Sequence, residues 1–103
     1  MSDVDTTLTP DRSRFEAHLE GELAGVVEYE LHEGTIELTH TRVEDRFEGK
    51  GVGSALARGA LDRIRAGEEP LGQRQVVATC TFISGWIDKH PEYADLLAGT
   101  DEP

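Results

Sequence analysis

A run of alternating glycines constrains this chain more than any other feature. Gly49, Gly51 and Gly53 stand beside basic residues, and an amphipathic helix pattern begins immediately after them. Glycine tolerates left-handed backbone, and a new helix presents free N–H groups at the positive end of its dipole. The run therefore predicts a strand–turn–helix unit whose backbone N–H groups bind a phosphate or diphosphate.

Apolar periodicity divides the chain before and after the glycine run into short elements. Alternating apolar residues predict strands over residues 15–19, 23–31 and 36–40, and the tight turns between them predict an antiparallel meander. After the glycines the period changes to four, which predicts a helix over residues 52–64 that Gly67 ends. The first half of the fold is therefore a meander that leads into a helix.

The C-terminal third supplies the second half of the fold. Residues 76–78 form an apolar run that fits a buried strand. A second helix is expected after Cys80, with a stop at His90-Pro91 and a last turn over residues 93–97. A strand–helix–strand crossover is right-handed and makes its two strands parallel. The predicted fold class is α/β (α+β), an antiparallel meander followed by a β-α-β unit and a C-terminal helix.

Length and composition limit the organisation and the partners. The 103 residues suffice for one domain, which we expect over residues 13–98 between a flexible acidic tail (1–12) and a short C-terminal tail (99–103). The net charge of −11 disfavours nucleic acid and anionic membranes as partners. There is one cysteine and neither a leader-like nor a membrane-length apolar run, so we expect a soluble, cytoplasmic protein.

Charge is unevenly distributed around the glycine run. Six of the ten basic residues lie within residues 42–65. A polyanionic ligand would be attracted there and repelled elsewhere. Arg46 and Lys50 are the candidates for phosphate contacts. For Arg58, Arg63 and Arg65 an exposed helix face is an equally good explanation.

Two common phosphate loops do not fit. In the P-loop pattern Gly51 would occupy the Ser/Thr position, so no hydroxyl is available for Mg²⁺. In the dinucleotide pattern G-x-G-x-x-G, Ser54 stands in place of the third glycine. The pattern that fits is Arg46-x-x-Gly49-x-Gly51. It resembles the R/Q-x-x-G-x-G/A loop of the GNAT superfamily of acyl-CoA N-acyltransferases.

Further segments resemble the minimal single-domain GNAT subfamily over roughly residues 13–95. They are Thr39-His40-Thr41, Cys80-x-Phe82 and Lys89-His90-Pro91-Glu92-Tyr93. Thr81 departs from the Cys-Pro-Phe that this subfamily often has. The resemblance implies a GNAT-like fold and an N-acetyltransferase that uses acetyl-CoA as co-substrate. The amine acceptor, a small molecule or a protein, is not identified by it, and the oligomeric state stays open.

The resemblance also implies a binding site. The loop amides would bind the pyrophosphate of coenzyme A, and a β-bulge amide near Arg42 or Val43 would meet the thioester carbonyl. The expected cofactor-binding residues are Arg42, Val43, Arg46, Phe47, Glu48, Gly49, Lys50, Gly51, Val52, Gly53 and Ser54.

Cys80 and His40 are the expected catalytic residues. Cys80 ends the strand beside the site, and a helix N-terminus next to it would favour the thiolate as a nucleophile, or the thiol as a proton donor. The alternative is a small buried hydrophobe. His40 is in phase with Ile36 and Leu38, so it is either a base near the loop or a core residue. No His, Cys, Asp or Glu cluster has the sequence spacing of a metal site.

Two other functions stay open from the sequence. One is a module that binds coenzyme A or acyl-CoA without turnover, since little chain remains to form an acceptor pocket. The other is a non-enzymatic interaction domain whose glycines only allow close packing of helix on strand.

Overall fold

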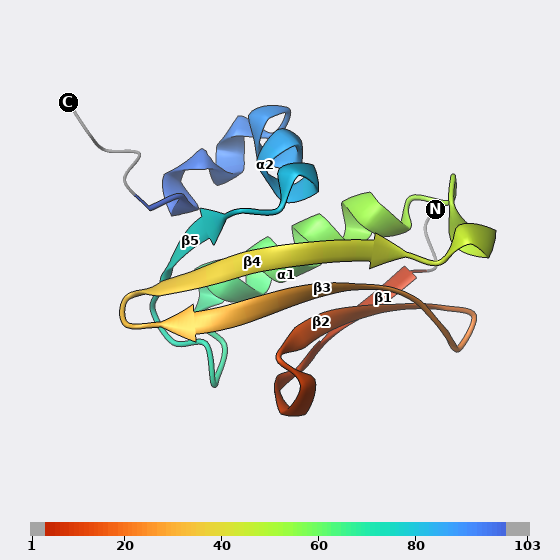
Figure 1. Ribbon diagram of the computed structural model, residues 1–103, viewed down its shortest axis with the longest axis horizontal. Coiled ribbons are helices and arrows are strands. Elements are labelled where there is room, and N and C mark those ends of the chain that lie inside the picture. The colour runs from red at the N-terminus through yellow and green to blue at the C-terminus, as the bar shows by residue number, and fades with distance from the viewer. Residues whose placement is uncertain (1–3, 99–103) are drawn as a thin grey trace.

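The computed structural model describes residues 4–98, which form one five-stranded sheet with helices packed on it (Figure 1). The strands are β1 (Val4–Thr9), β2 (Arg14–Leu19), β3 (Glu22–His32), β4 (Thr35–Val43) and β5 (Gln75–Ala78). The helices are α1 (Val52–Ala66) and α2 (Thr81–Asp88), and 3-10 segments cover Pro10–Arg12, Asp45–Phe47 and Pro91–Leu96. No helix among residues 4–98 is long and apolar enough to cross a bilayer.

The strand order is β1-β2-β3-β4-β5, antiparallel up to β4 and parallel between β4 and β5. The predicted meander and β-α-β unit are therefore confirmed. The predicted flexible tail over residues 1–12 is wrong for Val4–Thr9, which pairs with β2 along its whole length. Val4 and Leu8 pack against the core, which gives this polar edge strand its apolar face. Residues 1–3 and the predicted tail at 99–103 lie outside the described residues.

The core lies between the sheet and α1, which covers one sheet face behind β3 and β4 in Figure 1. Its largest fully buried side chains include Phe15, Ile36, Leu38, Leu56 and Leu61. Gly25 in β3 allows the close approach of α1. A Cβ there would lie 2.8 Å from the Arg42 carbonyl oxygen and 3.1 Å from Leu56 Cδ1. Burial of these apolar side chains contributes most of the free energy that holds α1 against the sheet.

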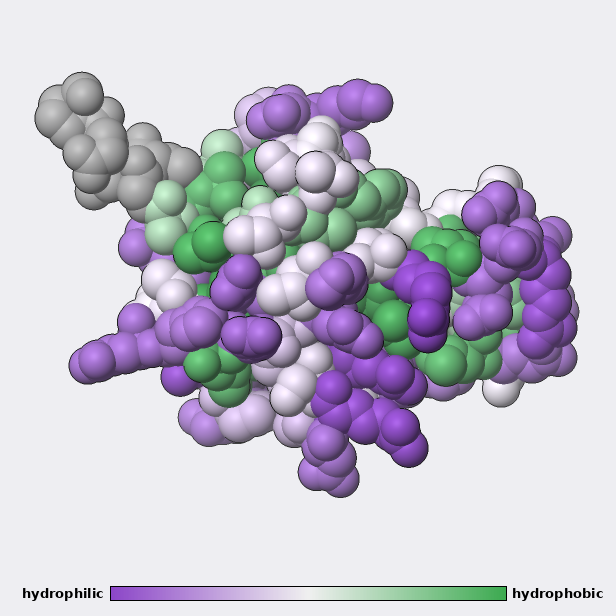
Figure 2. All heavy atoms as spheres, in the orientation of Figure 1, coloured by the Kyte–Doolittle hydropathy of each residue, from purple (hydrophilic) through white to green (hydrophobic). Residues whose placement is uncertain are grey.

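The other sheet face carries mainly hydrophilic side chains (Figure 2). Cross-strand pairing brings acidic residues and histidines together on it, as in the pairs Glu28 with His40 and Glu30 with Glu37. We call this the open face. It is the face on which a ligand can reach β3 and β4 without displacing α1.

A β-bulge in β4 reverses the side-chain alternation. Tyr29 pairs with Leu38 and Glu28 pairs with His40, so Thr39 is the extra residue. Its hydroxyl donates to the Glu28 carbonyl oxygen at 3.3 Å. The prediction that His40 shares the apolar face of Ile36 and Leu38 is wrong. The bulge turns His40 to the open face, where its side chain is 77% exposed.

The Lys-His-Pro-Glu-Tyr segment attaches the C-terminal elements to α1. The Tyr93 hydroxyl donates to Asp62 at 2.7 Å and accepts from Arg58 at 3.2 Å. The His90 ring stacks on Trp86, with 3.8 Å between ring centroids. The hydrogen bond to Asp62 and burial raise the pKa of Tyr93. These contacts fix the position of α2 and of Cys80, which directly precedes it.

Candidate functional site

The candidate site lies where β4 and β5 separate. The parallel ladder covers Thr35 to Leu38 in β4 and ends at the pair of Leu38 and Ala78. Beyond this pair, the Cys80 N–H and the Thr79 hydroxyl both donate to the Leu38 carbonyl oxygen, at 3.0 and 3.2 Å. We call residues 35–38 the paired half of β4 and residues 39–43 the open half. Within residues 4–98, the open half pairs with β3 but with no strand on its β5 side.

The bulge at Thr39 and the start of α2 explain this separation. The bulge bends β4 just beyond the last pair, and Cys80, the N-cap residue of α2, turns the chain away from the sheet. The bulge was expected near Arg42 or Val43. That position is wrong, because those residues pair regularly with Val26 and Gly25.

Cys80 faces the open half of β4 across this gap. Its thiol is buried, and Sγ lies 3.2 Å from Thr41 Oγ1. Its carbonyl oxygen accepts from the Ser84 N–H in the first turn of α2. His40 instead lies on the open face, with Nδ1 3.7 Å from a Glu28 carboxylate oxygen. Of the two expected catalytic residues, Cys80 thus contacts Thr41, whereas His40 points to the open face. No contact between Cys80 and His40 is present in the described part of the chain.

Thr41 is the site residue that the sequence analysis missed. Its register opposite Val27 places it on the side of α1 and Cys80, as a consequence of the bulge. The Thr-His-Thr segment is the sequence signal for it, but without the bulge at Thr39 simple alternation places His40 rather than Thr41 on that side. A hydroxyl beside a thiol can hydrogen-bond to either its protonated or its deprotonated form.

The glycine turn leads from β4 into α1. Gly49 and Gly51 have φ values of 82° and 81°, in the left-handed region that disfavours other residues. No atom outside the adjacent residues lies within 4 Å of where a Cβ would be at either position. Gly51 is the N-cap of α1 and has no side chain that could cap it. The N-terminus of α1 thus has no side-chain cap and follows an exposed glycine turn, two features that suit an anion site at a helix N-terminus.

Side chains of the loop divide into buried and exposed ones. Phe47 and Val52 are buried, so only their backbone can contact a ligand. Ser54 accepts a hydrogen bond from the Trp86 indole N–H at 3.0 Å. Gly53 lies under the Phe82 ring, where a Cβ would come within 2.9 Å of Cζ. The exposed residues between positions 46 and 54 are Arg46, Glu48, Gly49, Lys50, Gly51 and Ser54.

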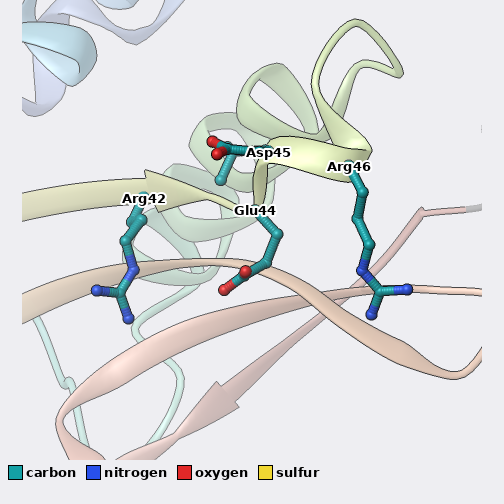
Figure 3. A pocket seen from close by; sticks show the side chains of 5 residues that line it. Arg42, Glu44, Asp45 and Arg46 are labelled. Atoms are coloured by element: carbon teal, nitrogen blue, oxygen red, sulfur yellow. The ribbon is translucent and has the colours of Figure 1, made fainter.

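A cavity of about 670 Å³ lies at the end of β4 and is lined by residues 42–46. Figure 3 shows Arg42, Glu44 and Arg46 pointing to one side of this segment and Asp45 to the other. The Arg46 guanidinium forms an ion pair with Glu22 at 2.5 Å and lies over the Phe47 ring. The two expected phosphate contacts, Arg46 and Lys50, are therefore both exposed, but Arg46 already has an anionic partner. Arg42, expected near the thioester, is exposed as well.

The three helix arginines have structural partners. Arg58 donates to Tyr93, Arg63 donates to the Thr6 carbonyl oxygen, and Arg65 forms a bidentate pair with Asp95. The Arg65 hydrogen bonds lower the pKa of Asp95. Of the basic residues near the glycine run, Arg42, Arg46 and Lys50 are thus the ones that remain for a phosphate ligand.

Comparisons with known proteins identify the family. The model of the GCN5-related N-acetyl-transferase family matches residues 14–96. A curated relative, Protein NATD1 of Xenopus tropicalis, is 35% identical over 57 residues, which are 55% of this chain and 48% of that protein. The chain thus matches about half the length of that relative. Because the family match covers most of the chain and the fold agrees with it, the chain belongs to the GCN5-related N-acetyltransferase family.

Proposed function

We propose that this domain is an N-acetyltransferase that uses acetyl-CoA as donor and an amine as acceptor. The observation that carries the proposal is the open half of β4. Among residues 4–98 its backbone pairs with no strand on the side of the Cys80 thiol, and it leads directly into the glycine turn and the N-terminus of α1. A pantetheine chain could extend along the open half while its pyrophosphate binds the turn.

The glycine turn would hold the donor through charge and backbone N–H groups. The uncapped first turn of α1 supplies donors and a partial positive charge. Arg42, Arg46 and Lys50 would add salt-sensitive attraction for the phosphates. Arg46 can do so only if it leaves or shares its ion pair with Glu22. The pair is exposed, so the exchange costs little.

Acetyl transfer forms one bond and breaks one. The amine nitrogen attacks the thioester carbonyl carbon, the C–N bond forms, and the C–S bond breaks as the coenzyme A thiolate leaves. The amine gives up a proton and the thiolate takes one. A backbone N–H of the open half would stabilise the carbonyl oxygen as negative charge develops on it.

Cys80 and His40 are our candidates for the proton transfers. The Cys80 thiol, beside Thr41, would protonate the leaving thiolate or accept the acetyl group itself. His40, beside Glu28, lines a cavity of about 280 Å³ on the open face. From there it would take the proton of an amine that enters through this cavity. A working thiol also fits a reducing compartment such as the cytoplasm.

Calorimetry and a thiol-release assay test the proposal together. We expect acetyl-CoA to bind with one-to-one stoichiometry at moderate salt, and a panel of small amines and lysine peptides to release free coenzyme A thiol. Absence of binding would contradict the proposal. Binding without thiol release from any acceptor would favour a coenzyme A-binding module.

Mass spectrometry separates the two roles of Cys80. Incubation with acetyl-CoA alone should acetylate Cys80 if it is a nucleophile, and Cys80→Ala would then lose transfer. If Cys80 is a proton donor, no adduct forms and Cys80→Ala slows transfer. Full activity of Cys80→Ala would leave the thiol with a structural role only.

A further inference from the structure

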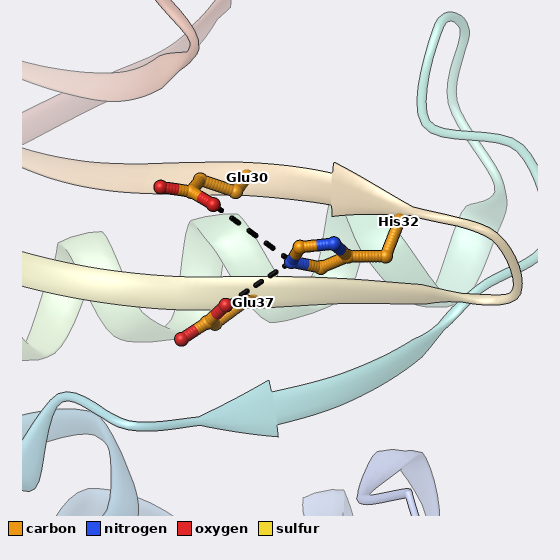
Figure 4. A group of neighbouring side chains, drawn as sticks. All are labelled: Glu30, His32 and Glu37. Atoms are coloured by element: carbon orange, nitrogen blue, oxygen red, sulfur yellow. Dashed lines mark hydrogen bonds and ion pairs between the residues drawn. The ribbon is translucent and has the colours of Figure 1, made fainter.

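A second cluster of chemical groups lies at the hairpin end of β3 and β4, at the opposite end of β4 from the glycine turn. It consists of Glu30 and His32 of β3 and Glu37 of β4, all on the open face (Figure 4). One ligand atom from each residue lies within 4.8 Å of the other two. No residue of this cluster belongs to the proposed acetyl-CoA site.

The imidazole stands between the two carboxylates. His32 Nε2 is 3.1 Å from Glu37 Oε1 and 3.9 Å from Glu30 Oε1, as the dashed lines in Figure 4 mark. All three groups therefore converge on one point rather than forming separate pairs. The side chains are 67%, 47% and 27% exposed for Glu30, His32 and Glu37, so a hydrated ion can reach them.

The backbone fixes this arrangement. Glu30 and Glu37 are direct cross-strand partners, a position in which two like charges destabilise a sheet. A cation between them removes that repulsion. The Thr79 hydroxyl, next to β5, donates to Glu37 Oε2 at 3.1 Å and leaves Oε1 directed to His32. Such outer hydrogen bonds orient metal-binding carboxylates.

We propose that Glu30, His32 and Glu37 bind one divalent transition-metal ion of the Zn²⁺ class. One imidazole and two carboxylates are ligands of Zn²⁺ and its neighbours, whereas Ca²⁺ requires six to eight oxygen ligands. Zn²⁺ ligands lie at about 2.0–2.2 Å, so tetrahedral ligand atoms stand roughly 3.3–3.6 Å apart. Binding would therefore require the cluster to contract, which the exposed Glu30 side chain could allow by rotation. Water completes the coordination.

Binding would join β3 and β4 near their turn. Because the three ligands come together only in the folded sheet, Zn²⁺ would stabilise the fold by mass action. The site would act on the paired half of β4 and leave the open half free. Its presence is independent of whether the domain transfers acetyl groups.

Isothermal titration of the full chain with ZnCl₂, in a non-chelating buffer and without an affinity tag, tests the site. We expect one ion per chain and a higher Tm with Zn²⁺, and no such effect of Mg²⁺. His32→Ala and Glu37→Gln should each weaken binding at least tenfold. None of the three ligands is buried in the core, so circular dichroism should show these variants folded.

Two control variants separate this site from other zinc ligands. His18→Ala removes a histidine of the same face that lies 3.7 Å from Glu16 but belongs to no three-ligand cluster within residues 4–98, so it should bind like the wild type. Cys80→Ser should also bind normally. Absence of binding, unchanged binding by His32→Ala, or an equal loss in His18→Ala or Cys80→Ser would overturn the proposal.

Discussion

The two halves of β4 show how one strand can serve both stability and binding. The paired half is hydrogen-bonded to β3 on one side and β5 on the other, and its Ile36 and Leu38 are fully buried under α1. The open half has β3 on one side and Cys80 across a gap on the other. A one-residue bulge at Thr39 separates them. The fold is thus secured in the paired half, and backbone becomes available for a ligand in the open half.

The largest effect should follow from breaking the paired half. Leu38→Ala removes a fully buried side chain from beneath α1 and should cost about 2–5 kcal/mol of unfolding free energy, as buried leucines do. Thr41→Ala, in the open half, should cost about 1 kcal/mol or less because it loses one hydrogen bond. Urea unfolding measures both. Equal losses of unfolding free energy would show that the paired half contributes no more to stability than the open half does.

Leu38→Ala is expected to act mainly on stability, whereas a substitution in the glycine turn should act mainly on acetyl-CoA binding. Gly51 and Gly34 both have φ of 81° and open space where a Cβ would be. Alanine at either position should cost about 1–2 kcal/mol of stability from left-handed strain alone. Only Gly51→Ala lies at the proposed pyrophosphate site, so it alone should weaken acetyl-CoA binding tenfold or more. Calorimetry with both variants, each checked for folding, measures this. Similar binding by the two would contradict the assignment.

Tyr93 links the C-terminal elements to α1, and its hydroxyl gives a pH test. Its pKa is raised by the bond to Asp62, so the stabilisation is complete below the ordinary value of 10.0 and lost as pH rises through the higher folded-state pKa. At neutral pH, Tyr93→Phe should have a free energy of unfolding about 1 kcal/mol below that of the wild type. As the pH is then raised, the free energy of unfolding of Tyr93→Phe should fall by less than that of the wild type. Tyr29, whose pKa burial also raises, is present in both proteins. Parallel alkaline unfolding curves would exclude this contribution.

The smallest expected effect concerns the ion pair of Arg46. Glu22→Gln frees the guanidinium for phosphate and should tighten acetyl-CoA binding by a few-fold at most, since exposed pairs contribute about 0–1 kcal/mol. Arg46→Gln should weaken binding and reduce its dependence on salt. Titrations at two salt concentrations measure both. Weaker binding by Glu22→Gln would show that the pair itself helps to form the site.

Most elements of the fold were predictable, because their apolar periods are long and clear. The strands around Phe15, Val27 and Leu38, the α1 stripe and the parallel β5 all follow from periodicity and from the crossover rule. β1 was missed because threonines and an aspartate separate its Val4 and Leu8, a pattern that a polar tail can also have. Its strand form depends on pairing with β2 and packing under α1, which are long-range contacts.

The site was predictable in its segments but not in its geometry. The glycine turn lies between β4 and α1, and Cys80 lies between β5 and α2, as the predicted order of elements requires. The bulge at Thr39 leaves no side-chain signal, yet it decides that Thr41 rather than His40 faces Cys80. The cluster of Glu30, His32 and Glu37 and the pair of Arg46 with Glu22 likewise depend on strand register and folding, not on sequence spacing.

Amide NMR during titration with coenzyme A tests the central claim most directly, because it reports on both halves of β4 at once. We predict that shifts concentrate at Gly49 and Gly51 of the glycine turn, at Ser54 in the first turn of α1, at Thr41 of the open half and at Cys80. The amides of Ile36 and Val76, within the parallel ladder, should change little. Absence of shifts at saturating ligand, or shifts confined to the paired half and its hairpin, would contradict the account.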